Sequence, residues 1–173
     1  MTEEHIPRMI LEATKAKDLM QPNPVSIEES ASIREGVAFL VGKKFSAAPV
    51  IDHAGRPVGV VSGADILVHH REKVRPAAPP DHYHGTEEMD RASIKDIMTP
   101  VVYSISLDAP VTEVIQQLLG LKVHRLFVVD KDGVLVGVIS SMDMLRHLRP
   151  ENGDFQAPET ASGDYVPHYC ELW

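Results

Sequence analysis

The hexapeptide KDLMQP at residues 17–22 recurs as KDIMTP at residues 95–100, an offset of 78 residues. Residues 17–67 align with residues 95–145 at this offset without a gap, and about 20 of the 51 pairs are identical. Duplicated supersecondary units commonly pack together, because each unit buries the apolar face that the other exposes. The sequence therefore predicts two copies of one structural unit.

Each copy has the pattern of a β-α-β-β-α unit. In the first copy the expected elements are a strand at 25–27, a helix from 33, strands at 48–51 and 58–61, and a helix near 63. The second copy repeats this order with strands at 103–105, 126–129 and 135–139 and helices from 111 and near 141. The predicted fold class is α+β (or α/β), with two tandem units packed about a pseudo-twofold axis.

Local signals mark the helix starts and the turns. Ser32 and Glu35 fit a capping box, and Pro110 fits the first turn of the corresponding helix in the second copy. Gly55 and Gly133 close the short polar turns DHAG and DKDG, which are typical of hairpins. The helices themselves are predicted from apolar residues at helical spacing: Ile33, Val37, Leu40 and Val41 in one copy, and Val111, Ile115, Leu118 and Leu119 in the other.

The composition narrows the classes of function. Among 173 residues, 17 Lys+Arg stand against 25 Asp+Glu, and a net charge of −8 argues against nucleic acid as a partner. No apolar run approaches the roughly 20 residues that span a membrane, and the acidic N-terminus does not resemble a secretory signal. One cysteine, Cys170, excludes an intrachain disulfide and fits a reducing compartment, so a cytoplasmic location and no membrane partner are expected.

The repeats divide the chain into five parts. They are an N-terminal extension at 1–16, a first repeat at 17–72, a linker at 73–92, a second repeat at 93–149 and a tail at 150–173. The tail is either a disordered end or, because it finishes in aromatic residues, a docking segment.

Catalytic and metal motifs are not evident. The sequence contains no P-loop, nucleophile elbow or HExxH pattern, so no enzyme activity is expected. The histidines at 69, 70, 82 and 84 lack cysteine or carboxylate partners at suitable spacing, so they are interpreted as solvated rather than metal-binding.

The repeated motifs KD[LI]MxP, [VI][IV]DxxG and GxxSxxD resemble those of the cystathionine β-synthase (CBS) domain, here as a tandem pair over residues 17–148. The resemblance implies a Bateman module, in which AMP, ADP, ATP or S-adenosylmethionine binds in clefts between the two copies and occupancy is transmitted to a partner protein. It also implies a homodimer in which helices of two chains pack together.

The Ser-x-x-Asp motif suits nucleotide binding. Ser62 and Ser140 stand at expected helix N-termini, where unpaired N–H groups and a hydroxyl favour a phosphate. Asp65 and Asp143 can each accept from two neighbouring ribose hydroxyls. The same residues also fit capping boxes that only satisfy their own helices, so both interpretations stay open.

The turn before the second expected strand differs between the copies. In the second copy, VHRLFVVD at 123–130 resembles a stretch of the γ subunit of AMP-activated protein kinase, which implies that His124 and Arg125 face phosphates. The alternative is that Arg125 pairs with a surface carboxylate. The first copy has Phe45-Ser46-Ala47 at this place, and in the γ subunit the similar version lines an adenine pocket.

The resemblance implies two sites, each combining the Ser-x-x-Asp of one copy with the turn of the other. Site one comprises Val60, Ser62, Asp65, Met98, Tyr103, Val123, His124 and Arg125. Site two comprises Val138, Ser140, Asp143, Met20, Val25, Phe45, Ser46 and Ala47. Site one is the more positive and is expected to prefer phosphates, whereas site two takes a less charged adenosine derivative or stays empty. Tyr103 either stacks on adenine or blocks it.

The leading hypothesis is a stand-alone regulatory module that senses an adenine nucleotide and is not an enzyme. The alternative is a structural or protein-interaction module with vacant clefts, in which Ser-x-x-Asp only caps helices. A nucleotide-processing enzyme is the least supported possibility, since no catalytic set accompanies the motifs.

Overall fold

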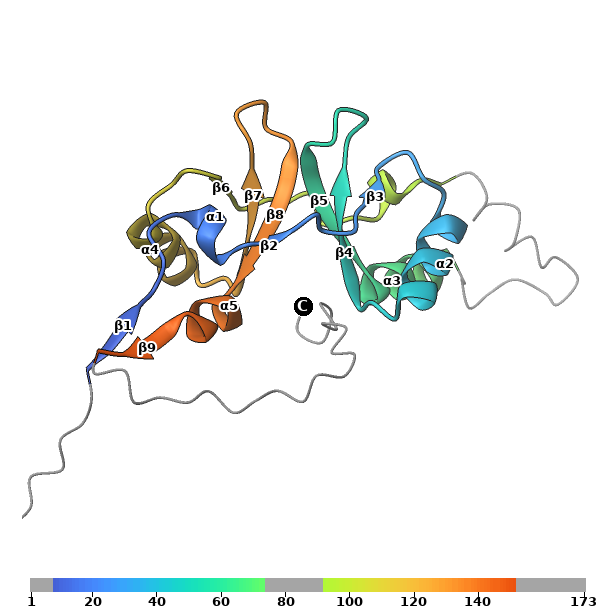
Figure 1. The fold of residues 1–173 in the computed structure, drawn as a ribbon. Helices are drawn as coiled ribbons and strands as arrows, with labels where there is room; N and C mark the ends of the chain where they lie inside the picture. The colour runs from blue at the N-terminus through green and yellow to red at the C-terminus, as the bar shows by residue number, and fades with distance from the viewer. Residues whose placement is uncertain (1–7, 74–91, 152–173) are drawn as a thin grey trace, which may run out of the picture. The chain divides into compact units, whose positions relative to one another are not determined.

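The computed structural model describes residues 8–73 and 92–151, which form two compact units. The N-repeat unit is built mainly from residues 23–73 and 92–102, and the C-repeat unit from residues 8–22, 103–131 and 136–151. Each contains strands and helices in the expected order, so the predicted α+β fold with two repeated units is confirmed (Figure 1).

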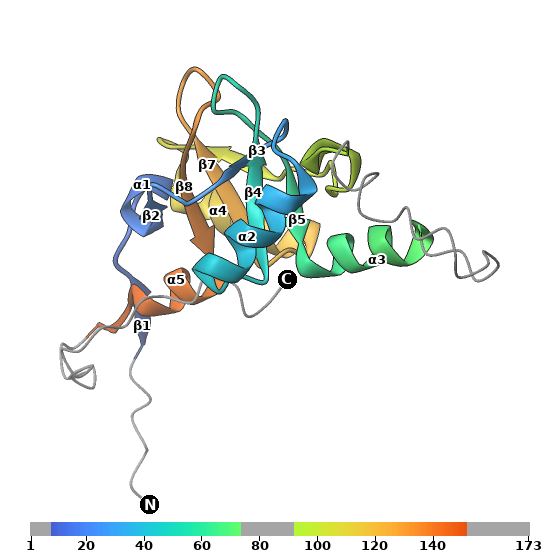
Figure 2. The ribbon, with the colours of Figure 1, turned by 90° about the vertical axis from the view of Figure 1, so that its right-hand side faces the viewer.

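The N-repeat unit contains a three-stranded sheet of order β3-β4-β5. Strand β3 (Ile27–Glu28) is parallel to β4 (Ala47–Ile51), which is antiparallel to β5 (Pro57–Ser62). Helix α2 (Ile33–Lys43) connects β3 to β4, and α3 (Gly63–Lys73) continues directly from β5 (Figure 2). A short 3-10 helix, η1 (Ile94–Asp96), completes the unit.

The C-repeat unit repeats this arrangement with one more strand. Its sheet has the order β2-β8-β7-β6, formed by Gln21–Pro22, Leu135–Ser140, Arg125–Val129 and Ser104–Ser106 respectively. Its helices are α1 (Ala16–Leu19), α4 (Val111–Leu121) and α5 (Ser141–Arg146). In the N-repeat unit the place of β2 is taken by Thr99, whose backbone bridges Val60 on β5.

The two segments that carry the KDxMxP motif, residues 14–22 and 92–100, are here called lead segments, and each packs on the other repeat. Ala16 N donates to Ala109 O (2.9 Å) in the C-repeat unit. Ile94 N donates to Ala31 O (2.8 Å) in the N-repeat unit. Each compact unit therefore combines the lead segment of one repeat with the sheet and helices of the other.

Both lead segments open with a carboxylate-capped turn. Asp18 Oδ2 accepts from the backbone N–H groups of Lys15 (2.9 Å) and Thr14 (3.0 Å), and these hydrogen bonds lower the pKa of Asp18. Asp96 Oδ2 accepts from Ser93 N (2.7 Å) and Ser93 Oγ (2.9 Å), which lowers the pKa of Asp96 in the same way. Each of the two turns is therefore stabilised by an ionised aspartate at the equivalent position.

Ion pairs join each lead segment to its unit. Lys15 Nζ and Lys17 Nζ lie 2.9 and 3.4 Å from Asp108 Oδ1, and their hydrogen bonds lower the pKa of Asp108. Lys95 Nζ lies 3.0 Å from Glu29 Oε2.

The ends of the described chain form an additional ribbon. Strand β1 (Met9–Leu11) pairs antiparallel with β9 (Leu148–Pro150), with Met9 opposite Pro150. These strands were not predicted from the sequence, which placed β1 in the N-terminal extension and β9 at the junction of the second repeat and the tail. The rest of the tail, Cys170, most of the linker, and His82 and His84 lie outside the described residues.

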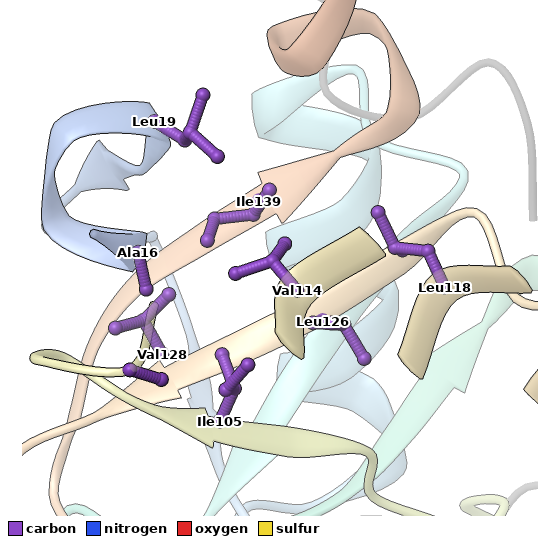
Figure 3. Close-up of a cluster of buried hydrophobic side chains, with 9 residues drawn as sticks. Ala16, Leu19, Ile105, Val114, Leu118, Leu126, Val128 and Ile139 are labelled. Atoms are coloured by element: carbon purple, nitrogen blue, oxygen red, sulfur yellow. The ribbon is translucent and has the colours of Figure 1, made fainter. Parts of the chain in front are cut away.

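Aliphatic side chains fill the core of each unit. The larger cluster, in the C-repeat unit, joins α1, α4 and the sheet (Figure 3), and its buried members are Ala16, Leu19, Ile105, Ala109, Val114, Leu118, Leu126, Val128 and Ile139. The N-repeat cluster consists of Ile27, Val50, Val61 and Ile94.

The helix faces differ from the expected ones. Leu40 and Leu118 are buried as predicted, but Val41 and Leu119 are each 72% exposed. The buried face instead includes Gly36 and Val114, which lie one residue before the predicted Val37 and Ile115. Apolar spacing locates a helix, but the packed partner selects which of two adjacent apolar stripes is buried.

The predicted caps and turns are mostly confirmed. Ser32 and Glu35 form the expected capping box. Gly55 and Gly133 have φ of +79° and +80°, as the hairpin turns require. Pro110 is the N-cap of α4, one residue earlier than predicted, because its ψ of 148° is extended.

Candidate functional site

The Ser-x-x-Asp motif joins β5 to α3 in the N-repeat unit. Asp65 Oδ2 accepts from Ser62 N (2.8 Å) and Ser62 Oγ (2.6 Å), and Asp65 N donates back to Ser62 Oγ (3.3 Å). This reciprocal arrangement is a capping box, so the helix-capping interpretation is correct for one carboxylate oxygen. Among the residues that the structure describes, none donates to the other oxygen, Asp65 Oδ1.

The same motif joins β8 to α5 in the C-repeat unit. Asp143 Oδ2 accepts from Ser140 N (2.8 Å) and Ser140 Oγ (2.6 Å). Here the second oxygen is also occupied: Asp143 Oδ1 accepts from Gln21 Nε2 (3.1 Å) and from Arg146 Nη1 (3.2 Å). Asp143 is only 3% exposed, whereas Asp65 is half-buried.

The turn before the central hairpin is tied to the Ser-x-x-Asp helix of its own unit. Ser46 O accepts from Gly63 N (2.9 Å), and His124 O accepts from Ser141 N (3.0 Å). Each turn follows a lysine in the left-handed conformation, Lys44 or Lys122, which ends the preceding helix. Ser46 and His124 are consequently held beside the start of the helix and remain exposed.

A methionine of each lead segment covers a strand glycine. A Cβ atom on Gly59 would lie 2.8 Å from Met98 Sδ and 2.7 Å from Thr99 O, and a Cβ on Gly137 would overlap Met20 Sδ. Glycine is required at both positions, because the lead segment runs directly over the strand beside Val60 or Val138.

The structure distributes the predicted residues evenly between the two units. The N-repeat unit holds Val25, Phe45, Ser46, Ala47, Val60, Ser62, Asp65 and Met98, and the C-repeat unit holds Met20, Tyr103, Val123, His124, Arg125, Val138, Ser140 and Asp143. Each predicted site takes four residues from each unit. The contacts described above establish the local geometry within each unit, and the joining of the two halves stays a prediction.

Two residues around the motif were missed by the sequence analysis. Gln21 and Arg146 complete the shell of hydrogen-bond donors around the Asp143 carboxylate. At the repeat offset their counterparts are Thr99 and Val68. These two residues differ between the copies, so they are not part of any repeated motif. A comparison of the positions at which the repeats differ would have pointed to them.

Other site types find little support in the described part of the chain. In residues 8–73 and 92–151 no cluster of three His, Cys, Asp or Glu side chains is placed to hold a metal ion. No helix within the same residues has the length and apolar character needed to cross a membrane.

Comparison with known proteins identifies one family. The family model for the CBS domain matches residues 16–71 and 94–150. Curated relatives include an A-adding tRNA nucleotidyltransferase of Aquifex aeolicus (27% identity over 79% of this chain) and a zinc metalloprotease of Methanocaldococcus jannaschii (33% over 79%). The chain spans only 15% and 33% of these two relatives, so the similarity concerns one module of larger proteins.

Solved structures give the same result. CBSX2 in complex with AMP has a TM-score of 0.57 and 28% identity, covering 78% of this chain and 95% of that one. The curated CBSX2 of Arabidopsis thaliana is 30% identical over 75% of this chain and 61% of its own length. The cytosolic domain of the Mg²⁺ channel MgtE in complex with ATP has a TM-score of 0.58 and 27% identity, covering 79% of this chain and 49% of that one.

Proposed function

The chain belongs to the CBS domain family, and we propose that it is a non-catalytic regulatory module that binds an adenine nucleotide or S-adenosylmethionine between its two repeats and passes occupancy to a partner protein. The AMP complex of CBSX2 and the ATP complex of MgtE support this proposal, since both are more than 25% identical to this chain.

The observation that carries the proposal is the open oxygen of Asp65. Its Oδ2 caps α3, while Oδ1 receives no donor from the described residues and keeps two lone pairs. Two adjacent ribose hydroxyls are donors of matching number. Ser62 acts chiefly by holding the carboxylate, because its hydroxyl proton is engaged by Asp65 Oδ2 at 2.6 Å.

The phosphate end is assigned to His124 and Arg125. Arg125 opens β7 and carries a permanent, planar positive charge, which suits an oxyanion. His124 is exposed, with its backbone carbonyl fixed by Ser141 N at 3.0 Å. Ligand binding then acts by population shift, since it favours the arrangement in which both repeats contact the ligand.

The test is titration of ligand-stripped protein with AMP, ADP, ATP and S-adenosylmethionine, by calorimetry and by thermal shift. A ligand at 100 times its Kd stabilises the folded state by about 2.7 kcal/mol. Asp65→Asn is expected to weaken binding, whereas Glu28→Gln, at an exposed residue of β3, serves as a charge-matched control. Absence of binding by all four compounds at millimolar concentration would exclude the proposal, and mass spectrometry of co-purified compounds identifies a ligand without prior choice.

A second function is favoured by the capping boxes themselves. Because Ser62 with Asp65 and Ser140 with Asp143 form reciprocal capping boxes at their helix starts, the chain is also suited to be a protein-interaction module with vacant clefts. In that case Ser62→Ala and Asp65→Asn lower the melting temperature and leave partner binding intact. Nucleotide-dependent partner binding distinguishes the first function from the second.

We also propose a homodimer. Helices α2 and α3 of the N-repeat unit expose Val41 (72%) and Leu67 (70%), and helices α4 and α5 of the C-repeat unit expose Leu119 (72%) and Leu145 (57%). Apolar residues at equivalent positions of both repeats suit a symmetric contact with a second copy of the chain.

A further inference from the structure

The two Ser-x-x-Asp carboxylates have different numbers of donors, and this difference is encoded in the sequence. Asp143 has four donors: Ser140 N, Ser140 Oγ, Gln21 Nε2 and Arg146 Nη1. A carboxylate offers about four lone-pair positions, so Asp143 is saturated by its own chain. Asp65 has two described donors, both from Ser62 and both on Oδ2.

The repeat explains why the shells differ. The position three residues after the aspartate is Arg146 in the C-repeat unit and Val68 in the N-repeat unit, and both side chains lie on the turn of helix that passes the carboxylate. The lead segment contributes Gln21 to Asp143, but its counterpart Thr99 is shorter and meets β5 through its backbone. The N-repeat unit therefore lacks both donors that close the second oxygen.

Burial follows the same division. The Asp143 side chain is 5% exposed and forms an ion pair with Arg146 at 3.2 Å. Displacing these partners would separate the buried Asp143 carboxylate from the guanidinium that neutralises it, which is costly. At Asp143 the ribose hydroxyls would only replace the hydrogen bonds that Gln21 and Arg146 already donate, whereas at Asp65 Oδ1 they would meet an oxygen to which no described residue donates.

We propose that Gln21 and Arg146 act as an internal plug that keeps the Asp143 carboxylate from ribose, so that the chain binds one nucleotide, at Asp65. This inference rests on the proposed nucleotide-binding function and adds the stoichiometry of that function and the residues that set it. Exchanging the two shells between the repeats is expected to exchange the binding behaviour.

The experiment measures AMP stoichiometry by equilibrium dialysis, with ATP as a second probe. Wild type is expected to bind one AMP per chain. The double variant Gln21→Thr/Arg146→Val, which copies the N-repeat shell, is expected to bind two. Val68→Arg places a guanidinium three residues after Asp65 and is expected to weaken the wild-type site by at least about tenfold, the scale of one charged hydrogen bond. Val68→Met is the control for a longer side chain without charge at the same position, and Lys131→Met is the control for loss of a positive charge at an exposed turn. Both variants should retain wild-type affinity.

Each outcome decides a separate point. Two equivalent sites in wild type, or a folded double variant that still binds one AMP, would overturn the plug while leaving nucleotide binding intact. Unchanged affinity in Val68→Arg, which alters a side chain that is 46% exposed and thus does not endanger folding, would also overturn it. No binding by any variant would refute the proposed function together with this inference.

A ligand-free measurement tests the plug independently. Asp143→Asn disturbs the capping box and also removes the negative charge that pairs with Arg146, whereas Asp65→Asn disturbs only the capping box. The melting temperature of the unliganded protein should therefore fall further for Asp143→Asn. Equal shifts in the two variants would show that Gln21 and Arg146 do not hold the carboxylate in solution.

Discussion

The Cα of Gly36 on α2 faces the side chain of Ile94, so closely that a Cβ atom at residue 36 would overlap Ile94 Cδ1. At the repeat offset the counterparts are Val114 on α4 and Ala16 on α1, which share one buried cluster. A large lead-segment residue therefore meets a small helix residue in the N-repeat unit, and the sizes are reversed in the C-repeat unit. These complementary volumes favour the observed exchange of lead segments, because the opposite pairing would leave a cavity in one unit and overpack the other.

Substitution at residue 36 tests this relationship. Gly36→Val is expected to destabilise the protein by about 1–3 kcal/mol through overpacking. Adding Ile94→Ala should recover part of the loss, giving a coupling energy of about 1 kcal/mol or more in a double-mutant cycle measured by urea unfolding. Gly42→Ala is the control on the same helix, since no atom lies within 4 Å of its Cβ position, and it should stabilise by about 0.5–1 kcal/mol. Strict additivity of the two core substitutions would contradict the contact.

The hairpin glycines provide a second test. Gly55 and Gly133 have φ near +80°, where a side chain is strained, so Gly55→Ala and Gly133→Ala should each cost about 1–2 kcal/mol. Gly120→Ala, in helix α4 with open space around its Cβ position, should not destabilise. The free energy of unfolding from denaturant titration separates these cases, and stabilisation by either hairpin alanine would disprove the turn geometry.

Acid sensitivity follows from the capped turns of the lead segments. Hydrogen bonds from backbone N–H groups lower the folded-state pKa of Asp18 and Asp96 below the ordinary value of 3.8. A depressed pKa contributes stability above the unfolded-state value, and that stability is lost as the pH falls through the folded-state pKa. Asp18→Asn and Asp96→Asn should therefore be less stable than wild type at pH 6, and the difference should shrink below about pH 4. Urea midpoints from pH 6 to pH 2.5 check this, and a constant difference would argue against ionised caps.

The exposed apolar helix residues give a prediction about assembly. Val41→Lys combined with Leu119→Lys should convert the proposed homodimer to monomer, as seen by light scattering after size exclusion. Both side chains are 72% exposed in the single chain, so the monomer should stay folded with little intrinsic change in stability. A double variant that remains dimeric would place the interface elsewhere.

Phosphate recognition is tested at Arg125. If this guanidinium contacts phosphate, Arg125→Met should lower the affinity for ATP about tenfold or more, and the affinity for adenosine much less. Calorimetry with both compounds gives the comparison. Equal losses for ATP and adenosine would assign Arg125 to the fold rather than to the anion.

Much of the site could be predicted because its parts are local. Ser62 and Asp65 are three residues apart, so strand-to-helix geometry alone brings them together. The hydrogen bond from Gln21 to Asp143 could not be predicted this way, since the two residues are 122 positions apart in sequence. The exposure of Val41 was likewise mispredicted, because the position of Ile94 against Gly36 decides which stripe of α2 is buried.

By itself the sequence determined the duplicated unit, its order of strands and helices, its glycine turns and its helix caps, because all of these depend on neighbours a few residues apart. Only the tertiary structure decided which lead segment packs on which repeat, that Gln21 reaches Asp143 from 122 residues away in sequence, and that β1 pairs with β9. Those outcomes depend on side-chain volumes and on hydrogen bonds between segments that are far apart in sequence. They are therefore settled only when folding brings the competing partners together.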